Sequence, residues 1–253
     1  MILNTVDTGQ GPPLVTLHGL MGSSTNWGGM AKRLGLKHRV IAMDARNHGA
    51  SGHAPDMEYG ALADDVAQTL AAMGVPRAAV LGHSMGGKIA MMLALTRPEM
   101  VERLVVADMS PVRYLAPSRA YVLAMQGMAL TPGMTRRDAM AALLPAVPQE
   151  GIRAFLVQNL VFGDGAPRWR VALGWIADGM DAIEDFAPPP GARYDGPTLF
   201  IRGSRSDYVL PDHMAAIAGF FPAARHAVVD AGHWVHADNP AAFLAALEPF
   251  LEA

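Results

Sequence analysis

A serine in a glycine-rich turn is the first residue whose surroundings suggest chemistry. Ser84 lies in Gly82-His83-Ser84-Met85-Gly86, which matches the pattern G-x-S-x-G. An apolar run, Ala78–Leu81, precedes this pentapeptide, and a helical pattern from Lys88 to Leu95 follows it. A sharp strand-to-helix turn lifts a serine hydroxyl out of a sheet, and small flanking residues let the backbone pass closely. The pentapeptide alone also fits a plain tight turn, but its context favours a nucleophile.

The same segment has a rival interpretation as a phosphate-binding loop. Gly82 to Lys88 fits G-x-x-x-x-G-K, and Leu104 to Asp108 resembles a strand that ends in a magnesium-binding aspartate. However, Ile89 follows the lysine, at the position where that loop needs Ser or Thr to hold the metal. We therefore keep a nucleotide-binding protein as the weaker hypothesis.

A serine nucleophile needs a base, and His233 is the best candidate. Gly232-His233-Trp234 follows the apolar run Ala227–Val229, where the last member of a Ser, acid, His order is expected. His236 is the nearest competitor, but a polar loop histidine that helps hold the turn explains it more simply. The remaining candidates precede or flank the serine turn and are interpreted as structural or supporting residues: His18, His48, His53 and His83.

A loop rich in Gly and Ser follows the predicted strand Leu14–Leu17 and begins with His18-Gly19-Leu20. Such a loop can direct a backbone N–H at a developing oxyanion, and the residue after the nucleophile supplies a second N–H. The sequence therefore predicts an oxyanion hole made by the amides of Leu20 and Met85.

Short apolar runs indicate the strands that must position these residues, and helical patterns lie between most of the runs. The clearest helix has Leu62, Val66, Leu70 and Met73 on one face. Alternating strands and helices predict an α/β fold with a mostly parallel central sheet flanked by helices. The predicted strands are Leu14–Leu17, Arg39–Met43, Ala78–Leu81, Leu104–Ala107, Thr198–Ile201 and Ala227–Val229.

The alternation is interrupted between Pro111 and Pro190, where helical patterns occur without a convincing strand. We expect a core domain formed by residues 1–110 and 191–253, and a helical cap insertion formed by residues 111–190. The Met, Phe and Trp side chains of the insertion are mostly expected on the inner faces of small helices. A minority of them could line an adaptable apolar pocket.

Composition excludes several classes of function. A length of 253 residues, with 51% hydrophobic and 17% charged residues, suits one folded core. A formal charge of −3 without basic runs argues against nucleic acid as a partner. The absence of cysteine excludes disulfides, cysteine-based zinc sites and a thiol nucleophile. The first residues lack a secretory signal and no stretch is long enough to span a membrane, so we expect a cytoplasmic protein.

Four segments, in order along the chain, resemble the motif set of small α/β-hydrolase esterases. The branch they resemble includes abhydrolase-domain-containing protein 11 and bacterial esterases. The resemblance implies hydrolysis of carboxylic esters or thioesters with no cofactor and no metal, and only residues 111–190 lack a strong motif. The segments are His18-Gly19-Leu20-Met21-Gly22-Ser23, Asp44-Ala45-Arg46-Asn47-His48-Gly49-Ala50-Ser51, Gly82-His83-Ser84-Met85-Gly86-Gly87-Lys88 and Gly232-His233-Trp234-Val235-His236.

Two aspartates compete for the role of triad acid. Asp207 follows the predicted strand Thr198–Ile201, where most α/β-hydrolases have their acid, but it could instead cap a helix after Pro211. Asp108 ends the strand Leu104–Ala107, the position used by the branch that the chain resembles, although it could be a plain turn residue. That branch also has a serine at the position of Ser206, which we assign an accessory role. We prefer Asp108 over Asp207.

The sequence therefore predicts a serine esterase that acts on short to medium acyl groups through a Ser84-His233-Asp108 triad and an acyl-enzyme. The expected partner is a small-molecule ester. Lactone hydrolysis, C–C hydrolysis and perhydrolysis share the fold and remain alternatives, and a non-catalytic binding scaffold is less favoured. Natural substrate, stereochemical preference and oligomeric state do not follow from the sequence.

Overall fold

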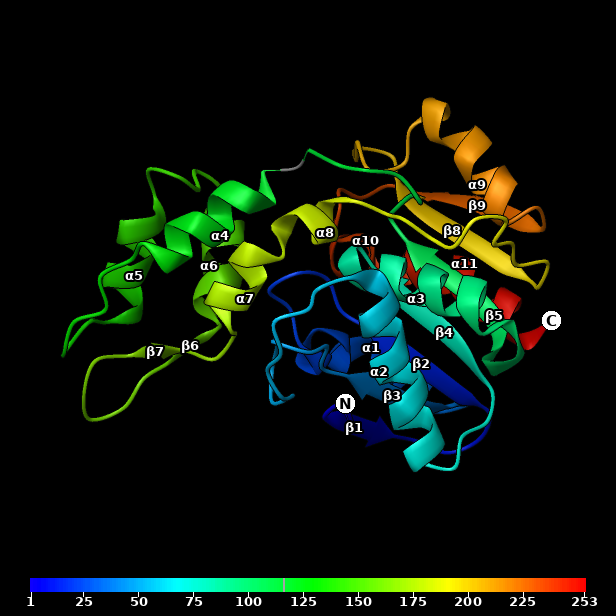
Figure 1. Cartoon of the computed structure of the whole chain (residues 1–253), viewed down its shortest axis with the longest axis horizontal. Helices are drawn as coiled ribbons and strands as arrows, with labels where there is room; N and C mark the ends of the chain where they lie inside the picture. Colours follow the sequence, from blue (N-terminus) through cyan, green and yellow to red (C-terminus); the bar gives the residue numbers. More distant parts are fainter. Residues whose placement is uncertain (116) are drawn as a thin grey trace.

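Seven strands form one sheet in a computed structural model that describes residues 1–115 and 117–253 (Figure 1). All neighbouring strands are parallel except β1, which pairs antiparallel with β3 at one edge. The prediction of a mostly parallel sheet is confirmed. In spatial order the strands are β1 (Thr5–Thr8), β3 (Arg39–Met43), β2 (Pro13–Leu17), β4 (Ala78–His83), β5 (Val101–Ala107), β8 (Thr198–Gly203) and β9 (Ala224–Val229).

Helices cover both faces of the sheet and divide the core into two clusters. Along β4, Ala78 and Val80 pack into one cluster, while Ala79 and Leu81 pack into the other. Successive side chains of a strand point to opposite faces, so a strand buried on both sides is apolar throughout. One face carries α2 (Tyr59–Ala72), α3 (Met85–Thr96) and α9 (Met214–Phe220), and the other carries α1 (Gly28–Leu34) and α11 (Pro240–Glu252).

The edge strands are the ones that the sequence did not fully indicate. β1 has the sequence Thr-Val-Asp-Thr and is only partly buried, so it lacks the apolar run of a central strand. β9 begins at Ala224, three residues before the predicted Ala227, and the sequence did not indicate this start because Arg225 and His226 are polar and exposed. Hydropathy therefore identified buried strands better than edge strands.

A mainly helical insertion separates β5 from β8 and lies beside the sheet in Figure 1. It also contains a hairpin of β6 (Leu160–Val161) and β7 (Arg168–Trp169), which was not predicted because two residues are too few to show a strand period. The cap boundaries 111 and 190 remain a prediction, and residue 116 of that range lies outside the described part. The helices are α4 (Ser118–Gln126), α5 (Arg136–Leu143), α6 (Glu150–Val157), α7 (Leu173–Asp178) and α8 (Met180–Glu184).

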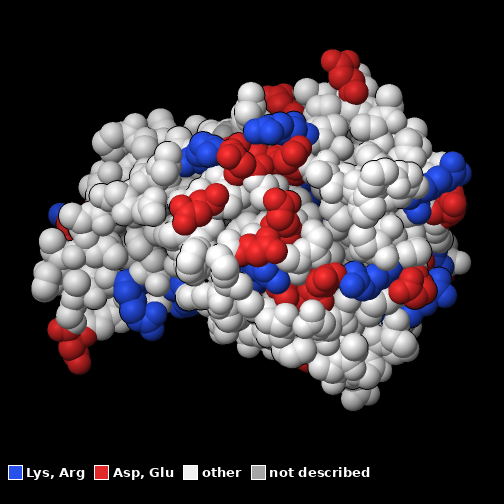
Figure 2. Space-filling model, viewed as in Figure 1, with Lys and Arg blue, Asp and Glu red and all other residues white. Residues whose placement is uncertain are grey.

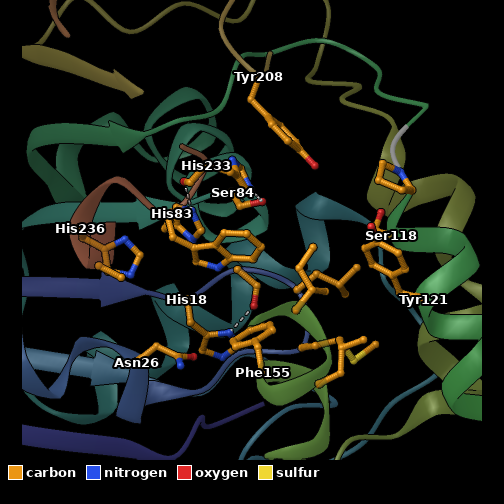
Figure 3. A pocket seen from close by; sticks show the side chains of 18 of the residues that line it. His18, Asn26, His83, Ser84, Ser118, Tyr121, Phe155, Tyr208, His233 and His236 are labelled. Atoms are coloured by element: carbon orange, nitrogen blue, oxygen red, sulfur yellow. Dashed lines mark hydrogen bonds between the residues drawn. The ribbon is translucent and has the colours of Figure 1, made fainter. Parts of the chain in front are cut away.

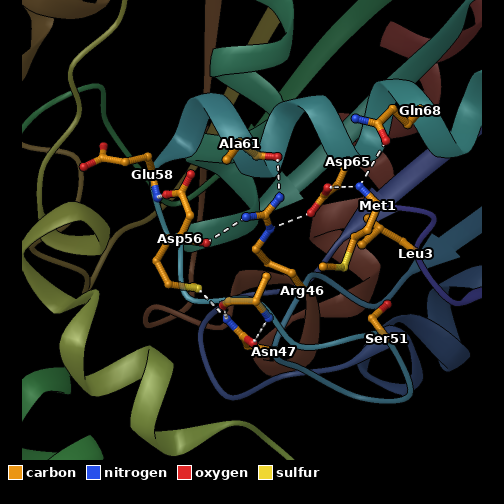
Figure 4. Close-up of polar contacts among 12 residues, drawn as sticks. Met1, Leu3, Arg46, Asn47, Ser51, Asp56, Glu58, Ala61, Asp65 and Gln68 are labelled. Carbon is orange, nitrogen blue, oxygen red and sulfur yellow. Dashed lines mark hydrogen bonds and ion pairs between the residues drawn. The ribbon is translucent and has the colours of Figure 1, made fainter.

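A buried arginine fixes the loop that follows β3 and the contact of this loop with the insertion. Arg46 donates to Asp65 at 2.6 Å and to the carbonyls of Asp56 and Ala61 at 2.8 and 3.1 Å (Figure 4). A buried pair of this kind holds one loop geometry, because breaking it leaves an uncompensated charge. The carbonyl of the next residue, Asn47, accepts from the N–H of Ala172 at 3.0 Å. The motif segment around Arg46 therefore supports the position of α7.

Charged side chains of both signs are interspersed over the face seen in Figure 2, and much of the inserted region on this face is uncharged. Large apolar side chains of the insertion that are exposed include Leu123, Leu144, Phe162 and Trp175. Acidic side chains gather near the middle of this face, and it shows no basic patch of the kind that tracks phosphates. Among the residues described, no helix combines the length and apolar character needed to cross a membrane.

Candidate active site

Ser84 lies at the turn between β4 and α3 with φ 54° and ψ −120°. Two glycines make this tight turn possible. A Cβ on Gly82 would lie 2.0 Å from the Gly86 carbonyl oxygen, and a Cβ on Gly86 would lie 2.3 Å from that of Leu17. The chain can therefore turn sharply and present the Ser84 side chain at the carboxyl end of the sheet.

His233 connects Ser84 to a carboxylate. Its Nε2 lies 3.0 Å from Ser84 Oγ, and its Nδ1 lies 2.7 Å from Oδ2 of Asp108. Figure 3 shows the side chains of His233 and Ser84. A carboxylate at Nδ1 favours the tautomer with the proton on that nitrogen, which leaves Nε2 to accept the serine proton. The three side chains come from loops after β4, β5 and β9, at the same edge of the sheet.

Asp108 is fully buried and receives further hydrogen bonds. The N–H of Gly203 donates to Oδ1 at 2.9 Å, and the Ser206 hydroxyl donates to Oδ2. The backbone of Asp108 is left-handed, with φ 51°, which turns the side chain toward His233. Ser206 therefore contacts the carboxylate of Asp108.

The structure leaves Asp207 apart from His233. Its side chain is exposed and has no hydrogen bond or ion pair with the described residues. It does not cap a helix either, because the short helix η3 (Pro211–His213) has Leu210 at its N-cap.

Tyr208 is a residue that sequence reasoning missed. Its ring stacks on the His233 imidazole, with ring centroids 3.7 Å apart and an angle of 18° between the planes. The Tyr208 carbonyl accepts from the hydroxyls of Ser110, at 3.1 Å, and Tyr114. These bonds fix the backbone that carries the Tyr208 ring. Burial raises the pKa of Tyr208, so its hydroxyl stays protonated near neutral pH. No pattern in the sequence marks this stacking partner.

Two of the histidines interpreted as supporting residues hold backbone near Ser84. His18 accepts from the N–H of Ala45 at Nε2, 3.0 Å away, and donates from Nδ1 to the Gly19 carbonyl at 2.8 Å. His83 Nε2 donates to the carbonyl of His233 at 2.9 Å. Burial lowers the pKa of both imidazoles, so both are neutral. They fix the two loops that adjoin Ser84.

His236, the competing base, does not reach Ser84. Its ring stacks on Trp27 with centroids 4.5 Å apart, and Nδ1 has no hydrogen-bond partner among the residues described. Burial, followed by the neighbouring His233, lowers the pKa of His236 to about 4. His48 is also buried and bonds to the Arg46 carbonyl, whereas His53 is exposed.

The amides predicted to form an oxyanion hole belong to residues that border the nucleophile. Met85 is the first residue of α3, so its N–H has no carbonyl one turn earlier in the helix. The N–H of Leu20 donates to no backbone acceptor within the described ranges. Leu20, Met85 and Ser84 line one common cavity.

A cavity of about 230 Å³ opens at Ser84 between the core and the insertion (Figure 3). Its core wall contains His18 and His233, and its opposite wall contains Tyr121 from α4 and Phe155 from α6. Most of the lining is apolar, which suits a hydrocarbon chain beside Ser84.

Lys88 is not available to bind phosphate. Its Nζ donates to the carbonyls of Glu184 and Asp185, at 2.9 and 2.8 Å, and more weakly to that of Ile183, at 3.4 Å. Burial lowers the pKa of Lys88 to about 7. This buried lysine holds the end of α8 against α3, which disfavours the phosphate-loop hypothesis.

No group of three or more His, Asp and Glu side chains is arranged to hold a metal ion within residues 1–115 and 117–253.

Residues 14–246 match the model of the alpha/beta hydrolase family. The mouse sn-1-specific diacylglycerol lipase ABHD11 is 43% identical over 249 residues, which cover 95% of this chain and 81% of the mouse protein. Esterase YbfF of Escherichia coli strain K12 is 36% identical over 241 residues, which cover 94% of this chain and 92% of the relative.

A solved structure described as a marine microorganism esterase superposes with a TM-score of 0.95 at 31% identity, covering 99% of both chains. The likeness to these proteins spans the core and the inserted helices together.

Proposed function

Since the chain belongs to the alpha/beta hydrolase family and is a hydrolase of its esterase and lipase class, we propose that it cleaves carboxylic esters through Ser84, His233 and Asp108. The observation that carries this proposal is the unbroken series of hydrogen bonds from Asp108 through His233 to Ser84, at 2.7 and 3.0 Å. In this proposal Asp207 has no part in the reaction.

Acylation begins when His233 Nε2 takes the proton of Ser84 while Oγ attacks the acyl carbon. The C–O bond of the ester then breaks, and His233 gives the proton to the departing alcohol oxygen. The amides of Leu20 and Met85 are the proposed donors to the tetrahedral oxyanion, each worth roughly 10²–10³-fold in turnover.

In deacylation, water is the nucleophile and Ser84 is the leaving group. His233 removes a proton from a water molecule, whose oxygen attacks the acyl carbon, and the proton returns to Ser84 Oγ as the carboxylic acid leaves. Asp108 holds the imidazole and stabilises its charged form in both steps, and Ser206 and Gly203 hold Asp108.

Labelling with a fluorophosphonate tests the nucleophile, because an activated serine attacks phosphorus as it attacks an acyl carbon. We expect one covalent adduct on the peptide that contains Ser84, detected by mass spectrometry. Ser84→Ala should remove the adduct, and Ser204→Ala, an exposed serine, is the matched control that should retain it. An adduct on a different serine, or none on the folded protein, would refute the assignment.

The cavity next to Ser84 supports a preference for short to medium acyl groups. It offers a volume of about 230 Å³ between the core and the inserted helices. Each methylene buried there is worth about 0.8 kcal/mol until the cavity is full. Longer chains must extend into solvent and gain nothing further.

An ester series with one leaving group tests this preference. With p-nitrophenyl acetate, butyrate, octanoate and palmitate, we expect kcat/KM to peak at butyrate or octanoate. The corresponding acyl-CoA thioesters measure whether thioesters are also cleaved. The highest kcat/KM on palmitate, or efficient turnover of emulsified long-chain lipid, would contradict the proposal.

A further inference from the structure

Ser84 borders a second cavity, of about 60 Å³, in addition to the large apolar one. We propose that this small cavity receives the alcohol half of the ester, and that the hydroxyls of Ser118 and Tyr208 select an uncharged alcohol with a further hydroxyl close to the ester oxygen. This inference rests on the proposed function and adds the chemical class of the leaving group.

The small cavity has two hydroxyls that are free to bind a ligand. Ser118 and Tyr208 line both cavities, and neither hydroxyl has a hydrogen-bond partner in the described part of the chain. Figure 3, which draws the large cavity, shows the Tyr208 and Ser118 side chains extending into the space between Ser84 and the insertion. A site whose polar groups lack partners favours a ligand that satisfies them and rejects the analogue that does not.

The other tyrosine hydroxyls of this cavity are already engaged. Tyr59 donates to the Ile183 carbonyl at 2.8 Å. Tyr114 donates to the Tyr208 carbonyl and accepts from the N–H of Ser110 at 2.9 Å. These two residues shape the wall and leave recognition to the free hydroxyls of Ser118 and Tyr208.

Size assigns the two halves of the ester to the two cavities. A volume of about 60 Å³ holds a few water-sized groups. It therefore suits a hydroxyalkyl group of two or three carbons, whereas the cavity of about 230 Å³ suits the acyl chain. Tyr208, whose ring stacks on His233, forms part of this cavity's wall beside the imidazole that would protonate the departing oxygen.

Charge in the wall argues against a cationic alcohol. Lys88 Nζ lies 5.5 and 5.0 Å from the ring centroids of Tyr59 and Tyr114 and forms no ion pair with the described residues. The Glu184 carboxylate, also in this wall, is held by Arg119 at 3.0 and 2.8 Å. A quaternary ammonium would lose its hydration here and would meet Lys88, which a pKa of about 7 leaves partly charged at neutral pH, without a free carboxylate to offset the repulsion.

Two isosteric pairs of butyrate esters test the proposal. Propyl and hydroxyethyl butyrate differ only by a terminal methyl or hydroxyl, and choline butyrate differs from its carbon isostere, the dimethylbutyl ester, only by charge. After correction for alkaline hydrolysis rates, we expect kcat/KM to favour hydroxyethyl over propyl by roughly five- to tenfold. The dimethylbutyl ester should exceed the choline ester by at least about tenfold.

Variants connect the preference to the two hydroxyls. Tyr208→Phe retains the ring on His233 and removes only the hydroxyl, and Ser118→Ala removes the other. In the double variant the hydroxyethyl-to-propyl ratio should fall to about one. Tyr121→Phe, which makes the same change in the large cavity alone, is the control that should leave this ratio unchanged.

Each contrary outcome has a distinct meaning. A ratio near one in the native protein, or a ratio that survives in the double variant, would overturn the inference while turnover of propyl butyrate and labelling of Ser84 leave the proposed function standing. A hydroxyl preference that appears with ethyl hydroxybutyrate instead would reject the assignment of the cavity to the alcohol. Choline butyrate as the better member of its pair would refute the charge argument. Failure to cleave any of the esters would overturn the proposed function and this inference together.

Discussion

Ser84 and Asp108 are both non-glycine residues with left-handed backbone, at φ 54° and 51°. Such a conformation costs about 1–2 kcal/mol per residue and persists only where the surroundings over-determine it. At Ser84 the close approach of Gly82 and Gly86 does this, and at Asp108 the hydrogen bonds from Gly203 and Ser206 contribute. Two of the four non-glycine residues with positive φ in the described ranges are therefore residues to which we assign chemistry, and the other two are Met21 and Asn47.

The two candidate acids give a direct comparison at this scale. Asp108→Asn is expected to lower kcat by about 10⁴-fold, because an amide at His233 Nδ1 favours the wrong imidazole tautomer. Asp207→Asn should change kcat by no more than about twofold, since that side chain is exposed and has no partner in the described ranges. Steady-state kinetics of both single variants and the double variant, with melting temperatures as the check on folding, measure the difference. A crippling loss in Asp207→Asn alone would reverse the assignment.

At the residue scale, the local sequence indicates a candidate site residue where a short motif carries the geometry. Ser84 and His233 stand in local patterns, and the structure brings them together. Tyr208 and Lys88 act through contacts with residues far along the chain, such as His233 and Glu184. Neither contact leaves a mark in the local sequence, so neither was predicted.

At the scale of elements, α3 packs closely against the strands that flank it, and Gly86 is its tightest contact. Gly86→Ala would bring a Cβ to 2.3 Å from the Leu17 carbonyl oxygen, which cannot move without disturbing β2. We expect the free energy of unfolding to fall by at least about 2–3 kcal/mol.

Gly60→Ala in α2 is the matched control for this substitution. A Cβ there meets nothing within 4 Å, so the variant should be unchanged or more stable by up to about 1 kcal/mol. Urea unfolding of both variants measures the contrast. Equal stability of the two variants would show that the elbow is less constrained than the structure implies.

The central elements were predictable because burial on both faces forces continuous apolar runs, as in β4 and the inner half of β5. The strands β1, β6 and β7 were not, since their few residues are partly exposed and their pairing is with strands elsewhere in the chain. The apolar pattern of a strand is therefore clear only where the strand is buried on both faces.

For the molecule as a whole, several buried histidines connect folding to pH. Burial lowers the pKa of His18 and, further, that of His83, and it lowers those of His48 and His236 to about 3 and about 4. An unfolded histidine has a pKa of about 6.5. Below that pH, these histidines therefore bind protons in the unfolded chain, whereas in the folded protein they stay neutral.

Stability should accordingly be complete above pH ~6.5 and fall as the pH drops toward the folded pKa values. Each such histidine adds up to ~1.4 kcal/mol per pH unit. His236→Phe keeps an aromatic ring on Trp27 and removes one titrating group that has no partner at Nδ1. Urea unfolding at about pH 7 and about pH 5 should show a smaller loss for this variant than for the native protein. An equal loss would exclude His236 from the pH dependence.

The fold class of the whole molecule followed from the alternation of strands and helices, and the interruption of that alternation indicated an insertion. The position of the insertion did not follow, because it depends on contacts such as Ala172 with Asn47 and Lys88 with the end of α8. The choice of substrate could not be predicted from the sequence either, since both cavities combine side chains from the core and from residues 111–190.

The insertion leaves the sheet after β5 and returns at β8, and these strands are direct neighbours, with Leu104 opposite Thr198. The two ends of the insertion are thus held side by side by the pairing of β5 with β8, whatever the length of the insertion. Natural variation can lengthen, shorten or replace the segment without shifting the register beneath Ser84. The strands that hold the proposed reacting groups can therefore stay the same while the segment that lines the cavities changes. Replacing residues 111–190 by the equivalent segment of an esterase relative should transfer the relative's acyl preference while Ser84 remains reactive.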